Sequence, residues 1–115
     1  MAGLTRGGVY LARLDPAKGP EIGKLRPVVL LTAQEILAVE PPLLFVCPLS
    51  SRSDPLFAAL HVELPRRDGL RVTSHALVEH CRAISRSRVL GDRLAQLRSE
   101  ELEVILHRLQ RLIGL

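Results

Sequence analysis

The sequence is poor in several residue types. It has no tryptophan, one tyrosine, two phenylalanines, one methionine and two cysteines in 115 residues. Cys47 and Cys81 both lie in apolar surroundings, so we expect reduced thiols in the core rather than a disulfide framework. No apolar run is long enough to span a membrane, and no charged segment followed by an apolar one begins the chain. We therefore expect a cytoplasmic protein.

Lysine is also scarce, which limits how the chain could bind nucleic acid. Lys18 and Lys24 are the only lysines, so arginine makes up the rest of the 16 basic residues. The formal net charge is +4. Guanidinium groups bind phosphates in a bidentate manner and stack on bases. Proteins that bind single strands usually present aromatic rings to the bases. If this chain binds RNA, we expect arginine and backbone groups to make most of the contacts.

The apolar pattern predicts a small, mainly-β domain with a C-terminal helix. A chain of this length is expected to be one domain, residues 1–115. We expect strands at 8–15, 27–31, 43–49, 57–64 and 74–84, and a polar connection at 85–93. Thr32 and Glu35 form a capping-box pattern that predicts a short helix. From Ser99, an expected N-cap, apolar residues recur at helical spacing up to Ile113, and Gly114 suits the C-terminal end.

The chain is organised around the stretch 19–32, a turn-rich loop that leads into an apolar run. Arg26 stands at the junction. Pro27 restricts Arg26 to an extended conformation and cannot donate a ladder hydrogen bond, so we expect Pro27 at the first position of a strand. This arrangement holds the permanently charged guanidinium of Arg26 at the edge of a strand. Taken alone, it also suits an ordinary surface arginine.

Six short motifs follow one another in order over nearly the whole chain. They are Gly8-Val9-Tyr10, Leu14-Asp15-Pro16, Gly19-x-Glu21-x-Gly23 with Arg26-Pro27-Val28, Pro48-Leu49-Ser50, His61–Leu64 and Leu77–Ile84. In this order they resemble the MazF/PemK family of toxin ribonucleases. The resemblance implies an SH3-like small barrel, as in MazF, PemK and CcdB proteins. It also implies a homodimer that cleaves single-stranded RNA without a metal or other cofactor, leaving a 2′,3′-cyclic phosphate and a 5′-hydroxyl.

The resemblance also implies which residues act. Arg26 is the expected catalytic residue, as a donor to the developing charge and to the leaving oxygen; a guanidinium is a poor base. Ser50, or Ser51 in the other register, matches the family threonine that holds the scissile phosphate. Glu21 and His80 are candidates for orientation or proton transfer. The expected RNA-binding residues are Lys18, Lys24, Arg52, Arg82 and Arg86.

Each of these residues also has a structural interpretation. Ser50 could only cap a turn, Glu21 could be a solvated loop carboxylate, and a single strand histidine is usually structural. We expect His61, His75 and His107 at the surface or on a helix face. No spacing resembles a zinc site. The sequence departs from the family pattern at Gly8, Leu11 and Ser85, which bears on RNA recognition more than on fold.

Two kinds of partner follow from the resemblance. A MazE-like antitoxin with an acidic C-terminal tail would bind along a basic groove, for which we expect Arg66, Arg67, Arg82, Arg86 and Arg88. The alternative is a non-catalytic, CcdB-like poison of DNA gyrase that acts through its C-terminal helix. The Arg26 and Ser50 pair favours the ribonuclease, because a CcdB-like contact needs no such site.

Overall fold

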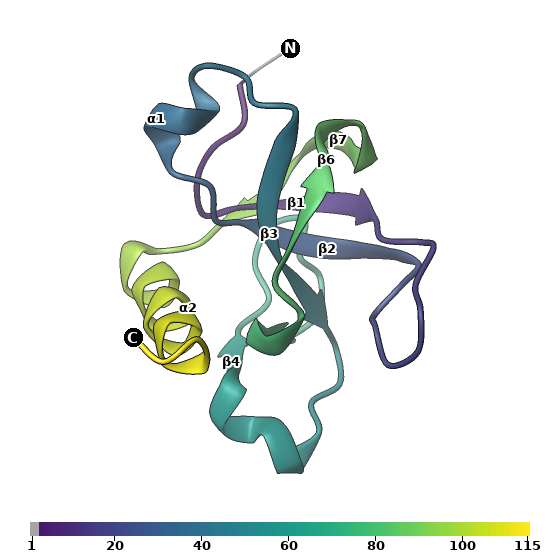
Figure 1. Ribbon diagram of the computed structural model, residues 1–115, viewed down its shortest axis with the longest axis vertical. Helices are drawn as coiled ribbons and strands as arrows, with labels where there is room; N and C mark the ends of the chain where they lie inside the picture. Colours follow the sequence, from purple (N-terminus) through teal and green to yellow (C-terminus); the bar gives the residue numbers. More distant parts are fainter. Residues whose placement is uncertain (1–2) are drawn as a thin grey trace.

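Strand β3 (Leu43–Ser50) joins the two halves of a strongly bent antiparallel sheet (Figure 1). The computed structural model describes residues 3–115. The sheet order is β4-β5-β3-β2-β1-β7, and β6 also pairs with β3. The other strands are β1 (Gly8–Arg13), β2 (Leu25–Leu30), β4 (His61–Leu64), β5 (Ser74–Leu77), β6 (Arg82–Ser85) and β7 (Val89–Gln96). The helices are α1 (Gln34–Leu37) and α2 (Ser99–Leu112), and the 3-10 turns are η1 (Pro55–Leu60), η2 (Val78–His80) and η3 (Arg86–Arg88).

β3 changes partners along its length. Its first half pairs with β6, its centre with β2 through the pair Val28 and Pro48, and its last two residues with β5. Within residues 3–115 the end strands β4 and β7 do not pair with each other. The expected mainly-β, SH3-like fold with a C-terminal helix is confirmed, although the sheet does not close into a complete barrel.

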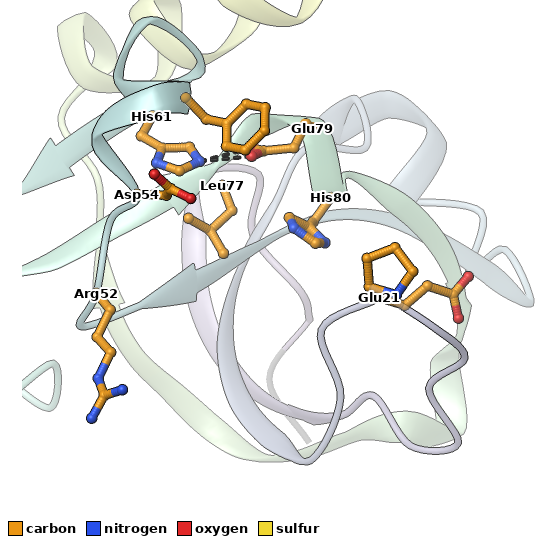
Figure 2. Close-up of a pocket in the computed structure, with 9 residues that line it drawn as sticks. Glu21, Arg52, Asp54, His61, Leu77, Glu79 and His80 are labelled. Atoms are coloured by element: carbon orange, nitrogen blue, oxygen red, sulfur yellow. Dashed lines mark hydrogen bonds and ion pairs between the residues drawn. The ribbon is translucent and has the colours of Figure 1, made fainter.

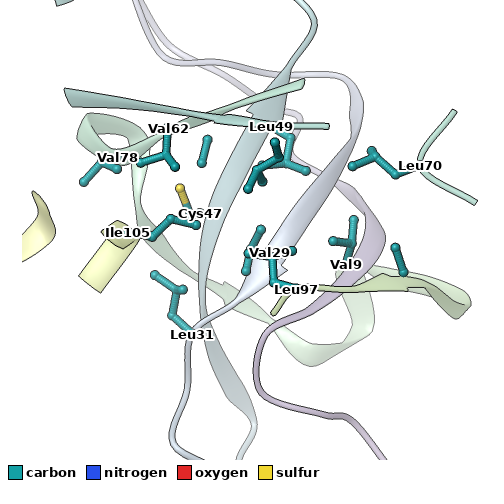
Figure 3. Close-up of a cluster of buried hydrophobic side chains, with 13 residues drawn as sticks. Val9, Val29, Leu31, Cys47, Leu49, Val62, Leu70, Val78, Leu97 and Ile105 are labelled. Carbon is teal, nitrogen blue, oxygen red and sulfur yellow. The ribbon is translucent and has the colours of Figure 1, made fainter. Parts of the chain in front are cut away.

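The core lies on both faces of β2, which explains why this strand has a continuous apolar run. Val29 belongs to one cluster, which also contains Ile105 of α2 (Figure 3). Val28 and Leu30 belong to a second cluster on the opposite face, with Tyr10. Side chains alternate between the two faces of a strand, so a strand with two buried faces cannot show a polar alternation.

Helix α2 begins and ends at capping contacts. The Arg98 backbone N–H donates to Glu101 Oε1 at 2.9 Å, and Gly114 adopts φ +83° just after the helix. Gly114 therefore closes the helix as expected. Ser99, the expected N-cap, is instead the first helical residue, and Arg98 takes the cap position. Neither helix within residues 3–115 has the length and hydropathy needed to cross a membrane.

Several other expectations about local structure are wrong. Thr32 does not cap α1, because its hydroxyl accepts from the Phe45 N–H at 2.8 Å. The strand expected at 57–64 begins only at His61, because Asp54 caps the turn η1 by accepting from the Leu56 N–H at 2.9 Å. Strand β2 starts at Leu25 rather than at Pro27; the proline is tolerated because β3 pairs with β2 only from Val28 onward.

The C-terminal part of the sheet also differs from expectation. The long strand at 74–84 is interrupted by η2, so β5 and β6 are separate strands. The connection at 85–93 contains η3 and the beginning of β7. Four consecutive residues of β7 are exposed, so the strand lacks the apolar alternation that would have revealed it.

Candidate functional site

Two adjoining cavities form a groove beside the loop that joins β1 to β2. The larger has a volume of about 550 Å³ (Figure 2). The smaller, of about 240 Å³, shares Glu21, Glu79 and His80 with it. We call the residues of both cavities the groove: Pro20, Glu21, Ile22, Arg52, Asp54, Phe57, His61, Leu77, Glu79, His80, Cys81 and Arg82.

A chain of hydrogen bonds forms the floor of the larger cavity. His61 Nε2 lies 3.0 and 2.8 Å from the two carboxylate oxygens of Glu79, and His61 Nδ1 lies 2.7 Å from Ser53 Oγ. Figure 2 shows the imidazole and the carboxylate facing each other. His61 is only 7% exposed, so the expectation of a surface position is wrong. The guanidinium of Arg108 in α2 donates to the His61 carbonyl, which ties the floor to the helix.

Sequence reasoning missed this pair because tertiary pairing creates it. His61 lies opposite Leu77 in the β4–β5 ladder, and Glu79 follows two residues later in η2. Eighteen residues separate the two partners. A buried histidine requires a hydrogen-bond partner, but the sequence contains no local pattern that identifies which acid supplies it.

The turn η2 determines which side chains reach the groove. The Cys81 N–H donates to the Val78 carbonyl at 3.2 Å, which closes the turn. Val78 is fully buried in the core, whereas Glu79 and His80 line both cavities. His80 was expected within a strand at 74–84; it lies instead at the end of this turn.

The β1–β2 loop forms the opposite wall and is held by its own hydrogen bonds. Asp15 Oδ1 accepts from the Lys24 N–H at 2.7 Å, and Glu21 Oε1 accepts from the Lys18 N–H at 2.8 Å. A Cβ on Gly23 would lie 2.5 Å from Asp15 Oδ1, so this position requires glycine. Lys24 itself adopts φ +67°, a left-handed conformation that a lysine rarely takes.

Arg26 and Ser50 occupy corresponding positions where β2 and β3 separate. Val28 and Pro48 are the last ladder pair, and two residues further along these antiparallel strands stand Arg26 and Ser50. Both are half-buried. Arg26 Nε donates to the Gly23 carbonyl at 2.9 Å, which fixes the base of the guanidinium. Ser50 Oγ accepts from the Arg52 N–H at 3.1 Å. Neither residue lines the groove itself.

The structure brings only some of the expected RNA-binding residues together. Arg52 and Arg82 line the groove, and Lys18 and Lys24 are exposed on its loop wall. Arg86 follows β6 at its other end, beside Pro42. That end is roughly 23 Å along β3 from Ser50, at about 3.3 Å per residue. Arg86 is therefore not part of this groove.

Two arginines expected along the antitoxin surface are bound within the chain. Arg67 Nη2 donates to Glu101 Oε2 at 2.6 Å. Arg88 donates to the carbonyls of Arg13, at 3.0 Å, and Asp15, and so holds the start of the β1–β2 loop. Both guanidinium groups have structural roles. Ser85, one of the departures from the family pattern, caps η3 at the end of β6 that lies away from the groove.

The carboxylates and histidines of the groove do not form a metal centre. Within residues 3–115, no group of three or more His, Cys, Asp or Glu side chains is arranged to hold a metal ion. Glu79 is engaged by His61, and Asp54 by the N–H of Leu56. The site is therefore a groove lined by apolar side chains together with carboxylates, histidines and arginines, with an Arg–Ser pair nearby.

This fold and site define a class of small toxins. Residues 5–113 match the family described as the PemK-like, MazF-like toxin of type II toxin–antitoxin systems. Because the match covers nearly the whole chain, the chain belongs to this family.

Solved structures agree with this assignment. The chain is 28% identical to MazF from Deinococcus radiodurans (Form-I), with a TM-score of 0.85 and full coverage of both chains. It is 26% identical to a chain of the MazE–MazF complex (Form-II) of the same organism, with a TM-score of 0.76 over 100% of this chain and 99% of that one. An endoribonuclease in complex with its cognate antitoxin, from Mycobacterial species, is 16% identical to this chain, with a TM-score of 0.73. The alignment covers 100% of this chain and 97% of that one. At this identity the similarity is one of fold alone.

Proposed function

We propose that this protein is an endoribonuclease toxin that cleaves single-stranded RNA, including messenger RNA, and thereby stops translation and growth. One observation carries the proposal: Arg26 and Ser50 occupy corresponding positions at the point where β2 leaves β3. Ser50 Oγ accepts from the N–H of Arg52, which lines the groove. A guanidinium and a hydroxyl at this point provide two donors for a phosphate, and the β1–β2 loop holds the guanidinium from behind.

The reaction needs no metal, because the nucleophile belongs to the RNA. The 2′-hydroxyl attacks the adjacent phosphorus, the 5′ oxygen leaves, and the products carry a 2′,3′-cyclic phosphate and a 5′-hydroxyl. Arg26 stabilises the charge that develops on the phosphorane oxygens and donates to the leaving oxygen. Ser50 donates its hydroxyl to a phosphate oxygen in the ground state.

The charges of the groove suggest how the RNA lies. Glu21, Asp54 and Glu79 bring three carboxylates to the larger cavity, which disfavours a phosphate there. Carboxylates accept hydrogen bonds from the amino groups of bases, and the exposed Phe57 ring provides a surface for stacking. We infer that a base enters the groove while the backbone follows Arg26, Ser50, Lys18, Lys24, Arg52 and Arg82.

Two groove residues can transfer or orient the proton of the 2′-hydroxyl. His80 is half-buried and lines both cavities, and Glu21 is exposed on the opposite wall. A histidine changes its protonation near neutral pH, which suits general acid–base catalysis. His61 is a weaker candidate, because both of its ring nitrogens already have hydrogen-bond partners.

We also propose that the toxin is a homodimer and is neutralised by a MazE-like antitoxin with an acidic C-terminal tail. The MazE–MazF complex of Deinococcus radiodurans supports this partner. Arg52 and Arg82 in the groove, together with Arg66, complement an acidic segment. The substrate implies action in the cytoplasm. Membership in the MazF-like family favours the ribonuclease over a CcdB-like gyrase poison.

One experiment tests the proposed chemistry. The purified protein is incubated with a long RNA in excess EDTA, and the ends of the fragments are mapped. We expect cleavage at a short recurrent sequence, with 2′,3′-cyclic phosphate and 5′-hydroxyl ends. A 5′-phosphate on the downstream fragment would overturn the mechanism, and intact RNA together with gyrase inhibition would favour the alternative.

A further inference from the structure

Two cysteines lie opposite each other beneath the groove. The last ladder pair between β3 and β6 joins Val46 to Arg82. Cys81 directly precedes β6, so the same register, continued by one residue, sets it opposite Cys47. Residues directly opposite each other in antiparallel strands have Cα atoms about 4.5–5.5 Å apart. This separation lies within the range of about 4.4–6.8 Å that a disulfide requires.

The two side chains also point to the same side of the sheet. Cys47 is fully buried in the core cluster that contains Val29 and Leu49 (Figure 3). Cys81 packs against the same cluster. The pKa of the Cys47 thiol is raised well above its usual value, first by the neighbouring Cys81 side chain and then by burial. Their opposite positions across β3 and β6, and their packing in one cluster, make the two thiols neighbours.

The two thiols differ in their access to solvent. Cys81 is half-buried and lines the smaller cavity of the groove, so a small oxidant can reach its sulfur. Cys47 has no exposed surface. Here an accessible thiol lies opposite a buried thiol on the neighbouring strand. In such a pair an oxidant converts the accessible thiol to a sulfenic acid, and the buried thiol then reacts with it to form the disulfide.

We propose that Cys47 and Cys81 form a reversible disulfide within one chain, which couples the groove to the redox state of its surroundings. A peroxide oxidises the Cys81 thiol to a sulfenic acid and is itself reduced to water. The Cys47 sulfur then loses its proton and attacks the Cys81 sulfur, releasing a second water. Overall, two thiols and one hydrogen peroxide give one disulfide and two waters. A dithiol reverses the reaction by exchange.

The raised pKa of Cys47 predicts how the second step depends on pH. Thiol chemistry proceeds through the thiolate. Because Cys47 is protonated near neutral pH, ring closure is expected to accelerate as the pH rises. The fixed position of the two sulfurs compensates for the small fraction of thiolate, since an attack within one molecule has a high effective concentration.

The disulfide would act on the groove through η2. An S–S bond of about 2.05 Å is shorter than any contact between two thiols, so one side of the pair must move. Cys47 pairs with Val29 inside the sheet, whereas Cys81 closes a three-residue turn at the edge of the groove. We expect η2 to shift, carrying Glu79 and His80. This part of the inference rests on the proposed function, because it concerns the rate of RNA cleavage.

The first test measures the bond itself and does not depend on activity. The reduced protein is treated with hydrogen peroxide, quenched, alkylated and examined by intact mass spectrometry. We expect the wild type to lose two hydrogen atoms, to resist alkylation, and to recover both thiols in dithiothreitol. The variants Cys81→Ser and Cys47→Ala should not lose two hydrogens. Wild type that retains two alkylatable thiols, gains oxygen, or cross-links between chains would overturn the proposal.

The second test measures the coupling to the groove. RNA cleavage is compared before and after oxidation, with each protein as its own reference, so the basal rates of the variants do not matter. We expect at least about a tenfold loss for wild type, restored by dithiothreitol, because a displacement of about 1 Å can cost about 10²-fold. The variants should change by less than about twofold, since they cannot form the bond.

The failures of the two proposals can be distinguished. A disulfide that forms without changing the wild-type cleavage rate would overturn the coupling. If the reduced protein cleaves no RNA, the proposed function fails, while the mass measurement still decides the disulfide. The coupling is then judged from the NMR signals of His80, which should shift on oxidation; unchanged signals would contradict it.

Discussion

Two acid–base pairs of similar burial lie at the two ends of β4: His61 is its first residue, and Arg67 lies in the turn that follows it. The His61 and Glu79 side chains are 5% and 23% exposed, and those of Arg67 and Glu101 are 19% and 10% exposed. Each pair joins segments that are distant in sequence. The first pair lines a cavity of about 550 Å³, whereas the second joins the turn after β4 to the first turn of α2.

The two pairs are similarly buried, so burial does not distinguish a candidate functional site from a structural ion pair. The groups and open space around each pair do. Glu101 accepts from both Arg67 and the Arg98 backbone, so its carboxylate has no room for another ligand. The pKa of Glu101 is lowered, first because Arg67 hydrogen-bonds to it. On the groove side, Glu79 lies beside His80, Glu21 and open volume. We therefore expect substitutions on the groove side to change activity and those on the helix side to change stability.

The largest expected effect is that of Arg26→Ala. It should lower the rate of RNA cleavage by about 10²–10³, because one donor to the transition state is lost. Its melting temperature should stay close to that of wild type, since the side chain is only half-buried. Arg111→Ala, an exposed arginine at the end of α2, is the matched control and should cleave normally. Arg26→Lys should rescue only in part, because a point charge does not reproduce the planar fork. Cleavage by Arg26→Ala at the wild-type rate would remove Arg26 from the site.

His61→Ala should affect both stability and activity. It leaves the Glu79 carboxylate and the Ser53 hydroxyl without their partner, which is expected to cost about 1–3 kcal/mol. Urea denaturation measures this loss, and cleavage should fall as well, because η2 loses its contact with β4. His107→Ala, exposed on α2, should change neither quantity. Full activity in a destabilised His61→Ala protein would limit the pair to a structural role.

Glu101→Gln should lower stability by about 1–2 kcal/mol near neutral pH and leave cleavage unchanged. The folded-state pKa of Glu101 is depressed, so its contribution is present above the unfolded pKa and is lost as the pH falls through the folded one. The difference in unfolding free energy between wild type and variant should therefore shrink as the solution is acidified below about pH 4.5. A difference that stays constant from neutral to acidic pH would contradict the role of the Arg67 contact.

The smallest expected loss of cleavage is that of Ser50→Ala. It removes one hydrogen bond to a charged phosphate, worth about 1.5 kcal/mol or roughly a tenfold change in rate, and folding should be unaffected. Ser50→Thr should be tolerated, because it keeps the hydroxyl. Comparison with Ser51→Ala, measured with the same RNA, decides the register: a larger effect at Ser51 would transfer the phosphate contact to that residue.

The candidate site could be predicted from sequence only where its residues lie in contiguous motifs. The Arg26-Pro27-Val28 motif predicted a guanidinium at a strand edge, and helical spacing predicted α2. The floor could not be predicted, because His61 and Glu79 meet only through the β4–β5 ladder. The turns η1 and η2 are too short and irregular to leave a periodic pattern, so the strands expected through them were too long.

The same reasoning applies to the arginines, whose sequence positions did not reveal their partners. Arg67 and Arg88 were expected along a basic surface, but they bind Glu101 and the backbone of the β1–β2 loop. Arg86 was grouped with Arg82 by proximity in sequence. The strand between them carries Arg86 to the far end of β6, where it lines a different cavity from Arg82.

The central claim is that the RNA supplies its own nucleophile to a site built on Arg26. The most direct test uses an oligonucleotide that contains the mapped cleavage sequence and a single 2′-deoxy substitution at the cleaved nucleotide, in EDTA. The account predicts that the substituted oligonucleotide binds with nearly the affinity of the all-ribose parent and is not cut. Cleavage of the substituted strand at the same position would contradict the account.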